Sequence, residues 1–323
     1  GHATYLINNG DINILTDPIF AKRASPIGFA GPERMIPAAM NLTDLPSIDV
    51  VVVSHNHYDH LDMYSLKRLH KINPETIFLV PMGDGKRLKK AGLTHVHELR
   101  WWESMEVGQS TIHFTPVQHW SKRGLFDRNK SLWGGWFIES KNLKLYHAGD
   151  TGYSNDFKTT YQRLGAPDYS FIPIGAYDPR WFMKDSHVNP EEAVQIALDL
   201  QTPHSFGMHW GTFTLTDEPV IEPPKRLAAE LKAQGLSPDF FRSPKPGEIL
   251  NELSEVSEYI TEKIPDYVAT RNESALLMCT STLITAGQRI SDLDLLFPPK
   301  EFSMILKSNS YNYLQNLPVR VGN

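Results

Sequence analysis

The stretch VVVSHNHYDHLD, residues 51–62, places four metal-binding side chains directly after a run of valines. The valines predict a buried strand, and residues two apart in an extended segment point the same way, so His55 and His57 can converge on one ion. The turn after them would aim Asp59 and His60 at a second point close by. Imidazole and carboxylate are the ligands of zinc, and iron and manganese accept them too. Because all four cannot reach one tetrahedral ion without strain, the stretch favours a site for two ions.

A two-ion site needs further ligands, and the sequence offers three candidates at the ends of later apolar runs. They are His119 in FTPVQHW, Asp150 in AGDTGY and His209 in HWGTF. Small residues precede Asp150, so its carboxylate can approach both ions and is the predicted bridge. The predicted ligand sets are His55, His57, His119 and Asp150 for one ion, and Asp59, His60, Asp150 and His209 for the other.

Most of the remaining histidines carry no such pattern. A lone histidine is more often a surface residue, or a core residue with satisfied hydrogen bonds, than a metal ligand. We therefore predict no role in the site for His2, His70, His95, His97, His113, His147 and His204.

The composition limits the classes of protein that remain. Apolar residues make up 41% and charged residues 21% of the 323 positions, which is typical of a globular protein. The net charge of −5 argues against a nucleic-acid-binding protein, which usually has a basic stripe. The single cysteine, Cys279, excludes an internal disulfide and a thiolate zinc site. No stretch reaches the ~18–20 apolar residues of a membrane span, and the opening GHATYLINNG shows no signal peptide but resembles a truncated start. We expect a cytoplasmic or peripheral membrane protein.

Short β-type runs alternate with helical patterns over most of the chain, which indicates a layered α/β fold. The runs lie at 3–7, 12–16, 49–54, 76–80, 111–117, 133–139, 143–148, 169–174 and 204–210, and the helices at 62–72 with Asp62 as N-cap, 190–201 and 223–235. All 13 histidines lie at or before position 209. We therefore predict a catalytic domain over residues 1–250 and a C-terminal extension of unknown role over 251–323, which includes the amphipathic NELSEVSEYITEKI.

The strings around these residues resemble a known family. SHNHYDHLD is similar to the HxHxDH signature of the metallo-β-lactamase superfamily. LTDPIF, RASP, FTPVQHW, AGDTGY, PIGAYDPRWFMK, HVNPEEAV and HWGTF resemble the N-acyl-phosphatidylethanolamine-hydrolysing phospholipase D family and fall in its order. The resemblance implies a four-layer αββα sandwich with two zinc ions on the same seven ligands. It also implies hydrolysis of a phospholipid phosphodiester to phosphatidic acid and an N-acylethanolamine, and a homodimer.

The resemblance assigns roles to further residues. It implies that Asp17, in LTDP, supports the loop that carries His55, His57 and His60, called the histidine loop below. It also implies that His187, in DSHVNPEE, lies near the substrate phosphate. His187 would hydrogen-bond the phosphate or supply a proton to the leaving group, alongside Asp150 and Asp59 as catalytic ligands. Position 186 is Ser where mammalian members have Gln, so polar contacts in the site entrance can differ.

A phospholipid substrate requires contact with a membrane surface. The segments 18–40 and 122–133 mix apolar side chains with cations such as Lys22, Arg23 and Arg34, which suits an anionic interface or, equally, an ordinary loop packed on the sheet. Trp181, Phe182 and Met183 are candidate acyl-chain contacts, although such residues are as often core. Two other functions stay open: a sugar-phosphate lactonase of the same fold, and a binding protein with structural metals.

Overall fold

The valines of the opening stretch form β3 (Val50–Val52), which is buried on both faces. In the computed structural model, which describes residues 1–250, Val50 and Val52 lie in an apolar layer between two β-sheets. Val51 and Val53 point the other way, into an apolar layer shared with helical residues such as Leu66. Successive residues of a strand face opposite sides, so a run that is apolar at every position fits a strand covered on both.

β3 is the central strand of a five-stranded sheet with the order β1-β2-β3-β4-β5. Strands β2 to β5 run parallel, and β1 pairs with β2 antiparallel. The other strands are β1 (Leu6–Asn8), β2 (Asn13–Thr16), β4 (Ile77–Pro81) and β5 (Val96–Leu99). The helices of this half are α1 (Met63–Ile72), α2 (Gly85–Lys90) and the 3-10 turn η1 (Leu42–Asp44).

The second sheet has seven strands in the order β12-β11-β10-β9-β8-β7-β6. Strands β9 to β12 run parallel, and β6 to β9 alternate in direction. The strands are β6 (Ser104–Val107), β7 (Ser110–Thr115), β8 (Gly135–Glu139), β9 (Lys144–His147), β10 (Tyr169–Pro173), β11 (His204–Met208) and β12 (Phe241–Arg242). The helices are α3 (Asp156–Leu164), α4 (Arg180–Met183), α5 (Pro190–Asp199) and α6 (Glu222–Ala233).

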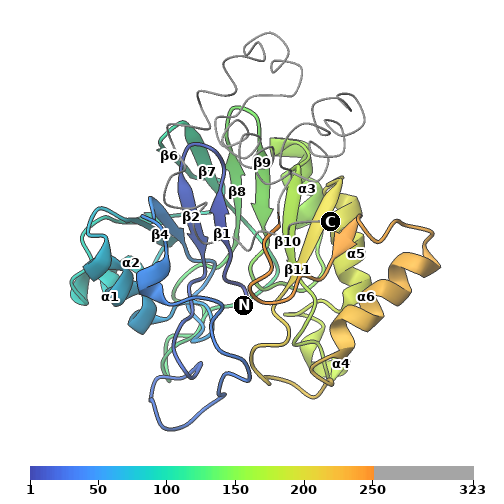
Figure 1. Cartoon of the computed structure of the whole chain (residues 1–323), viewed down its shortest axis with the longest axis horizontal. Helices are drawn as coiled ribbons and strands as arrows, with labels where there is room; N and C mark the ends of the chain where they lie inside the picture. Colours follow the sequence, from blue (N-terminus) through green and yellow to red (C-terminus); the bar gives the residue numbers. More distant parts are fainter. Residues whose placement is uncertain (251–323) are drawn as a thin grey trace, which may run out of the picture. The chain divides into compact units, whose positions relative to one another are not determined.

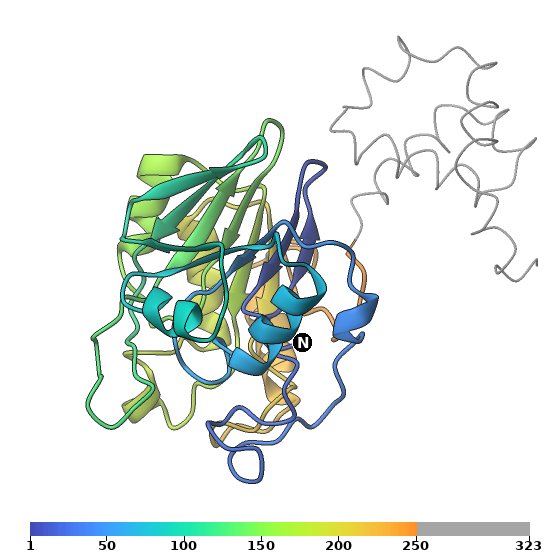
Figure 2. The same ribbon diagram turned by 90° about the vertical axis from the view of Figure 1, so that its left-hand side faces the viewer.

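The two sheets pack face to face, with helices on their outer faces (Figures 1 and 2). The inner layer contains Ile14 and Leu79 from one sheet and Phe114, Trp136 and Leu145 from the other, all buried. The rings of Phe114 and Trp136 lie 4.6 Å apart and join adjacent strands of the larger sheet. The predicted four-layer αββα sandwich is thereby confirmed.

The helices predicted within residues 1–250 are present, and several elements were not predicted. Asp62 caps α1 by accepting a hydrogen bond from the backbone N–H of Tyr64, as expected. α5 begins at Pro190 with a capping box between Asn189 and Glu192. The elements without a sequence prediction are η1, β5, β6, α2, α3, α4 and the two-residue β12. They are short or strongly polar, so their hydrophobic periodicity is weak.

The part of the chain from Gly1 to Glu248 forms one compact unit. The extension predicted over 251–323, its amphipathic helix and Cys279 lie outside the described residues. Among residues 1–250, no helix has the length and apolarity needed to cross a bilayer.

Candidate metal centre

Two groups of metal-binding side chains lie where parallel strands of both sheets end. Because the carboxyl ends of parallel strands meet at one edge, the loops after them converge there. His55 follows β3, Asp150 follows β9, and His209 comes directly after β11. The seven predicted ligands all belong to compact groups of side chains that could hold a metal ion.

The first group consists of three imidazoles with no acid between them. Nε2 of His55 lies 2.8 Å from Nδ1 of His57, and Nε2 of His119 lies 3.3 Å from the same atom. Burial lowers the pKa of His57 to about 4, and it holds the pKa of His55 and His119 well below the usual range. The three rings are therefore neutral at neutral pH and present lone pairs, which is the form that binds a metal.

The second group combines Asp59, His60 and His209. Oδ2 of Asp59 lies 3.3 Å from Nε2 of His209 and 3.5 Å from Nε2 of His60. Burial alone would lower the pKa of His209, but Asp150 and Asp59 raise it to about 9. Burial would also lower the pKa of His60, yet the charges of Asp150 and Asp59 hold it well above its usual range.

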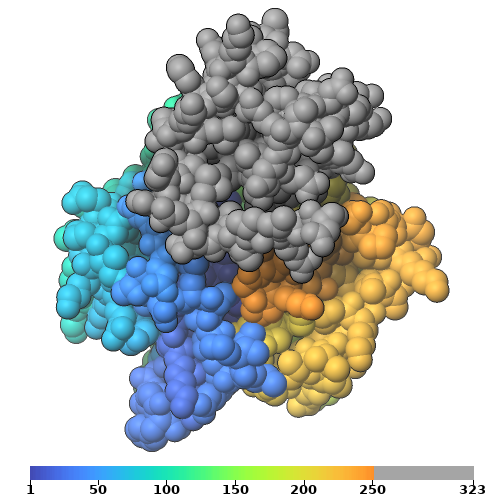
Figure 3. All heavy atoms as spheres, viewed as in Figure 1, coloured from blue at the N-terminus to red at the C-terminus, as the bar shows by residue number. Residues whose placement is uncertain are grey.

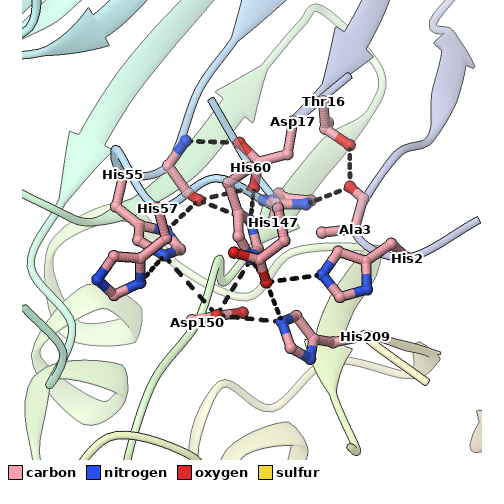
Figure 4. Close-up of polar contacts among 12 residues, drawn as sticks. His2, Ala3, Thr16, Asp17, His55, His57, His60, His147, Asp150 and His209 are labelled. Carbon is pink, nitrogen blue, oxygen red and sulfur yellow. Dashed lines mark hydrogen bonds and ion pairs between the residues drawn. The ribbon is translucent and has the colours of Figure 1, made fainter. Parts of the chain in front are cut away.

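Asp150 lies between the two groups (Figure 4). Its Oδ2 is 3.1 Å from Nε2 of both His60 and His209. The same oxygen is 3.7 Å from Nε2 of His55 and 4.0 Å from that of His119. A single carboxylate thus faces ligands of both groups, which is the position that the sequence predicts for a bridge.

The hydrogen bonds on the outer side of the rings fit metal ligation. His55 donates from Nδ1 to Ser54 Oγ at 3.0 Å, and His119 donates from Nδ1 to the Ser186 carbonyl at 2.9 Å. A ligating histidine usually donates its other ring N–H in this way, which fixes the tautomer and turns the lone pair inward. Within residues 1–250, Asp150 Oδ1 is buried without a hydrogen-bond partner. This donor set fits divalent metal ions.

Asp17 supports the histidine loop from beneath. Its backbone is in the left-handed region, with φ at 35°, and its carboxylate accepts hydrogen bonds from the backbone N–H and the hydroxyl of Ser54. Nδ1 of His60 lies 2.8 Å from Asp17 Oδ2. Burial would raise the pKa of Asp17, but His60 and these hydrogen bonds lower it, so the group is a charged acceptor. These contacts join Asp17 to the loop that carries His60.

His187 lies at the rim of the centre. Its Nε2 is 3.9 Å from Asp150 Oδ2, and its ring meets that of His119 edge-on with centroids 5.2 Å apart. The backbone is anchored because Arg180 donates to the His187 carbonyl at 2.6 Å and pairs with Glu192. Burial lowers the pKa of His187 to about 4. Ser186 contributes its backbone carbonyl to His119, a contact that does not depend on the side chain at this position.

The predicted acyl-chain contacts lie on α4 and are not core residues. Trp181 is 81% exposed and Phe182 is 68% exposed, while Met183 is half-buried. The segment 18–40 projects at the lower end of the unit in Figures 1 and 3 and exposes Phe29 at 83%.

Arg34, one of the cations of the segment 18–40, is only partly exposed. Its guanidinium donates to the carbonyls of Ile19 and Ala21, so it braces the base of the loop.

Three residues with no predicted site role lie in or beside the centre. His2 contacts Asp59 in the second group. The expectation that His2 lies outside the site is wrong, because backbone hydrogen bonds to Thr212 Oγ1 and from His209 bring the start of the chain to the metal edge. His147 donates a hydrogen bond to the carbonyl of Ala3, the residue after His2, at 3.1 Å. His147 is a buried core residue with a hydrogen bond, as expected. Arg123 donates to the carbonyls of Asn56, His57 and Leu61 and so clamps the histidine loop. No local periodicity in the sequence marks these tertiary contacts.

Comparison with known proteins agrees with this arrangement. Residues 12–210 match the model of the beta-lactamase superfamily domain. The chain is 42% identical over 261 residues to the N-acyl-phosphatidylethanolamine-hydrolyzing phospholipase D 1 of Caenorhabditis elegans, covering 77% of this chain and 73% of the relative. The chain belongs to the N-acyl-phosphatidylethanolamine-hydrolyzing phospholipase D family of the metallo-β-lactamase superfamily. The resemblance stated from the sequence is confirmed.

Other members of this phospholipase D family and more distant structures extend the comparison. The mitochondrial enzyme of this name from Saccharomyces cerevisiae is 39% identical over 231 residues, which are 69% of this chain and 48% of that protein. The solved structure of Igni18, a metallo hydrolase of Ignicoccus hospitalis, is 20% identical with a TM-score of 0.58, over 77% of this chain and 94% of that one. An isothiocyanate hydrolase from Delia radicum gut bacteria is 19% identical with a TM-score of 0.61, over 77% of this chain and 96% of that one. These two structures establish the fold alone.

Proposed function

We propose that this protein is a dinuclear zinc phosphodiesterase that hydrolyses N-acyl-phosphatidylethanolamine or a related glycerophospholipid to phosphatidic acid and an N-acylethanolamine. The observation that carries the proposal is Asp150, whose Oδ2 faces His60 and His209 on one side and His55 and His119 on the other. The similarity to a nematode protein with this activity in its name supports the choice of substrate. Two divalent ions, when bound, would supply an activated water and stabilise charge on the phosphoryl oxygens.

The side chains of the centre would supply charge balance for the ions and a hydrogen bond for the substrate. Asp150 and Asp59 place two carboxylates among five imidazoles, so the centre can balance the charge of two cations. His187 stands at the rim beside His119 and Asp150, where an incoming phosphate would meet it. As a neutral ring, His187 would donate a hydrogen bond to a phosphoryl oxygen, the first of the two roles considered for it. Its anchored backbone favours a fixed direction for that donor.

A hydrolysis assay tests the substrate directly. Metal-replete protein is incubated with N-acyl-phosphatidylethanolamine vesicles, and release of N-acylethanolamine is followed by mass spectrometry; a sugar-phosphate lactone serves as the competing substrate. We expect release of the N-acylethanolamine and no opening of the lactone. Turnover of the lactone with no lipid product would refute the proposal in favour of a lactonase.

The role of His187 is tested with the variant His187→Ala. Turnover should fall by about 10–100-fold, the range for loss of one well-placed partner, with both ions retained. Ser186→Ala is the matched control, because only the backbone carbonyl of Ser186 contacts the centre. Loss of an ion from His187→Ala would show that His187 is a ligand instead.

We further propose that the lower end of the unit meets the phospholipid surface. Three segments of the backbone lie toward this end in Figures 1 and 2: the loop after β2, the loop between β7 and β8, and α4. Each exposes large apolar side chains, which are Phe29 in the first, Leu125 and Phe126 in the second, and Trp181 and Phe182 on α4. Lys122, Arg128 and Lys130 are exposed beside Leu125 and Phe126. Apolar groups that can enter the headgroup region next to cations that attract anionic lipids are the features of an interfacial surface.

A double variant separates this surface from the chemistry. Leu125→Ser with Phe126→Ser should weaken sedimentation with anionic vesicles and slow hydrolysis of vesicle substrate, while a short-chain monomeric substrate is cleaved at the original rate. Ile72→Ser is the control, since Ile72 is 50% exposed at the end of α1, away from these segments in sequence. Unchanged vesicle binding by the double variant would exclude this surface.

A further inference from the structure

The imidazole of His2 packs against the second group of ligands. Its Nε2 lies 3.0 Å from Oδ2 of Asp59, and its ring centroid is 3.9 Å from that of His209 (Figure 4). On its other side the ring meets Phe213 edge-on at 5.3 Å. The residue is only 4% exposed, so its polar ring atoms depend on partners inside the protein.

The backbone of His2 is tied to the same loop that carries His209. The His2 N–H donates to Oγ1 of Thr212 at 2.8 Å, and the His2 carbonyl accepts from the N–H of His209 at 3.1 Å. Thr212 and His209 both lie in the loop after β11. The two hydrogen bonds therefore join the start of the chain to the metal edge. These bonds fix the position of the ring relative to His209 independently of its contact with Asp59.

Both histidines hold an uncommon backbone conformation. His2 has φ at 61° and His209 has φ at 63°, in the left-handed region that non-glycine residues rarely occupy. Such conformations persist only where the surroundings fix them, and they gather at functional sites. A glycine at position 2 would relieve the strain but would remove the ring, which points to a use for the imidazole itself.

We propose that His2 is a positioning residue for the second ion: its Nε2–H donates to Asp59 and holds the carboxylate opposite His60 and His209. Of the described ion pairs, His2 takes part only in that with Asp59, whereas His60 and His209 each contact both Asp59 and Asp150. His2 therefore contacts Asp59 but not the bridging Asp150, which suits a hydrogen-bond donor that orients a ligand rather than replaces one.

Metal binding by two variants tests this role, which rests on the two-ion centre proposed above. His2→Phe keeps a ring against His209 and Phe213 but removes the donor, whereas His2→Gln keeps an N–H near the position of Nε2. Competition with a chelator should show one of the two ions bound about 10–100-fold more weakly in His2→Phe, with the other ion unaffected. His2→Gln and the surface control His95→Phe should bind both ions as the wild type does. Wild-type affinity in a folded His2→Phe would overturn the proposal, and a loss in His2→Gln equal to that in His2→Phe would overturn the hydrogen-bond assignment.

The ¹⁵N spectrum of the wild-type imidazoles gives a measurement that needs no variant. Nε2 of His2 should carry a slowly exchanging proton both before and after metal loading. Loss of that proton with a metal-induced shift would make His2 a direct ligand and refute the positioning role. A wild type that binds a single ion would refute the two-ion centre, and the retained or lost Nε2 proton would still decide the role of His2.

Discussion

Oδ2 of Asp17 lies 2.8 Å from Nδ1 of His60, and both side chains are fully buried. Asp17 also accepts two hydrogen bonds from Ser54, so its oxygens have no freedom to turn. The carboxylate therefore holds a proton of His60 on Nδ1 and turns the Nε2 atom toward Asp59 and Asp150. A side chain outside the ligand set thus fixes the tautomer of a ligand.

Replacing Asp17 by Asn should weaken metal binding more than it alters the fold. An amide donor facing Nδ1 would move the His60 proton to Nε2, the atom that must be free to bind metal. We expect one ion to bind about 10–100-fold more weakly in Asp17→Asn, measured by competition with a chelator. Asp44→Asn, an exposed carboxylate on η1, is the control. Unchanged affinity for both ions in Asp17→Asn would contradict the tautomer argument.

Arg123 gives a second prediction, because it holds the histidine loop through three carbonyl oxygens. Its guanidinium lies 2.9 Å from the Asn56 carbonyl and 2.7 Å from the Leu61 carbonyl, and it stacks on Tyr58. Hydrogen bonds to a charged group contribute about 1.5–3 kcal/mol each, so Arg123→Met should lower the free energy of unfolding by about 2–4 kcal/mol in urea titrations.

The control for Arg123 comes from the same loop. Arg128 lies over the ring of Trp120 at 4.7 Å and is exposed, so Arg128→Met should change stability by less than about 1 kcal/mol. Equal effects of the two variants would show that the carbonyl contacts of Arg123 contribute little.

The sequence predicted the metal loop better than its supports, for a physical reason. His55, His57, Asp59 and His60 are close in sequence, so local geometry alone restricts where they can point. His2 and Arg123 reach the same loop through tertiary contacts from elsewhere in the chain, and no periodicity encodes those. The central strands were predicted because both of their faces are apolar, whereas short polar elements such as β6 depend on pairing with a neighbour.

Asp150→Asn should abolish hydrolysis. Asp150 is the described acid that contacts histidines of both groups, and its neighbours His209 and His60 hold its pKa well below the usual range against the effect of burial. Loss of its charge should reduce turnover by more than about 100-fold, beyond the range for an outer partner, and release at least one ion. Metal analysis and a single-turnover assay measure the two effects. Asp185 is an exposed acid in the loop before His187, so Asp185→Asn should retain the turnover and both ions of the wild type. Full activity of Asp150→Asn would exclude the role of Asp150 as a bridge.

The buried acid Asp84 gives a prediction about pH. It accepts hydrogen bonds at 3.0 Å from Asn56, which lies within the histidine loop, and from Ser131, yet its Oδ2 has no hydrogen-bond partner among the described residues. Burial raises the pKa of Asp84 from 3.8 to about 6. The folded state therefore holds the proton more tightly than the unfolded chain does. The associated stability is present below about pH 4 and is lost as the pH rises through about 6.

Asp84→Asn removes this titration while keeping an oxygen that can accept from Asn56 and Ser131. The shift from 3.8 to about 6 corresponds to at most about 3 kcal/mol, of which about 1–1.5 kcal/mol falls between about pH 5 and about pH 7.5. Relative to the wild type, Asp84→Asn should therefore gain stability by that amount between these two pH values, measured by urea unfolding of the metal-free protein. The exposed Asp217→Asn should show no such gain. A difference between Asp84→Asn and wild type that stays constant with pH would mean that Asp84 ionises freely in the folded protein.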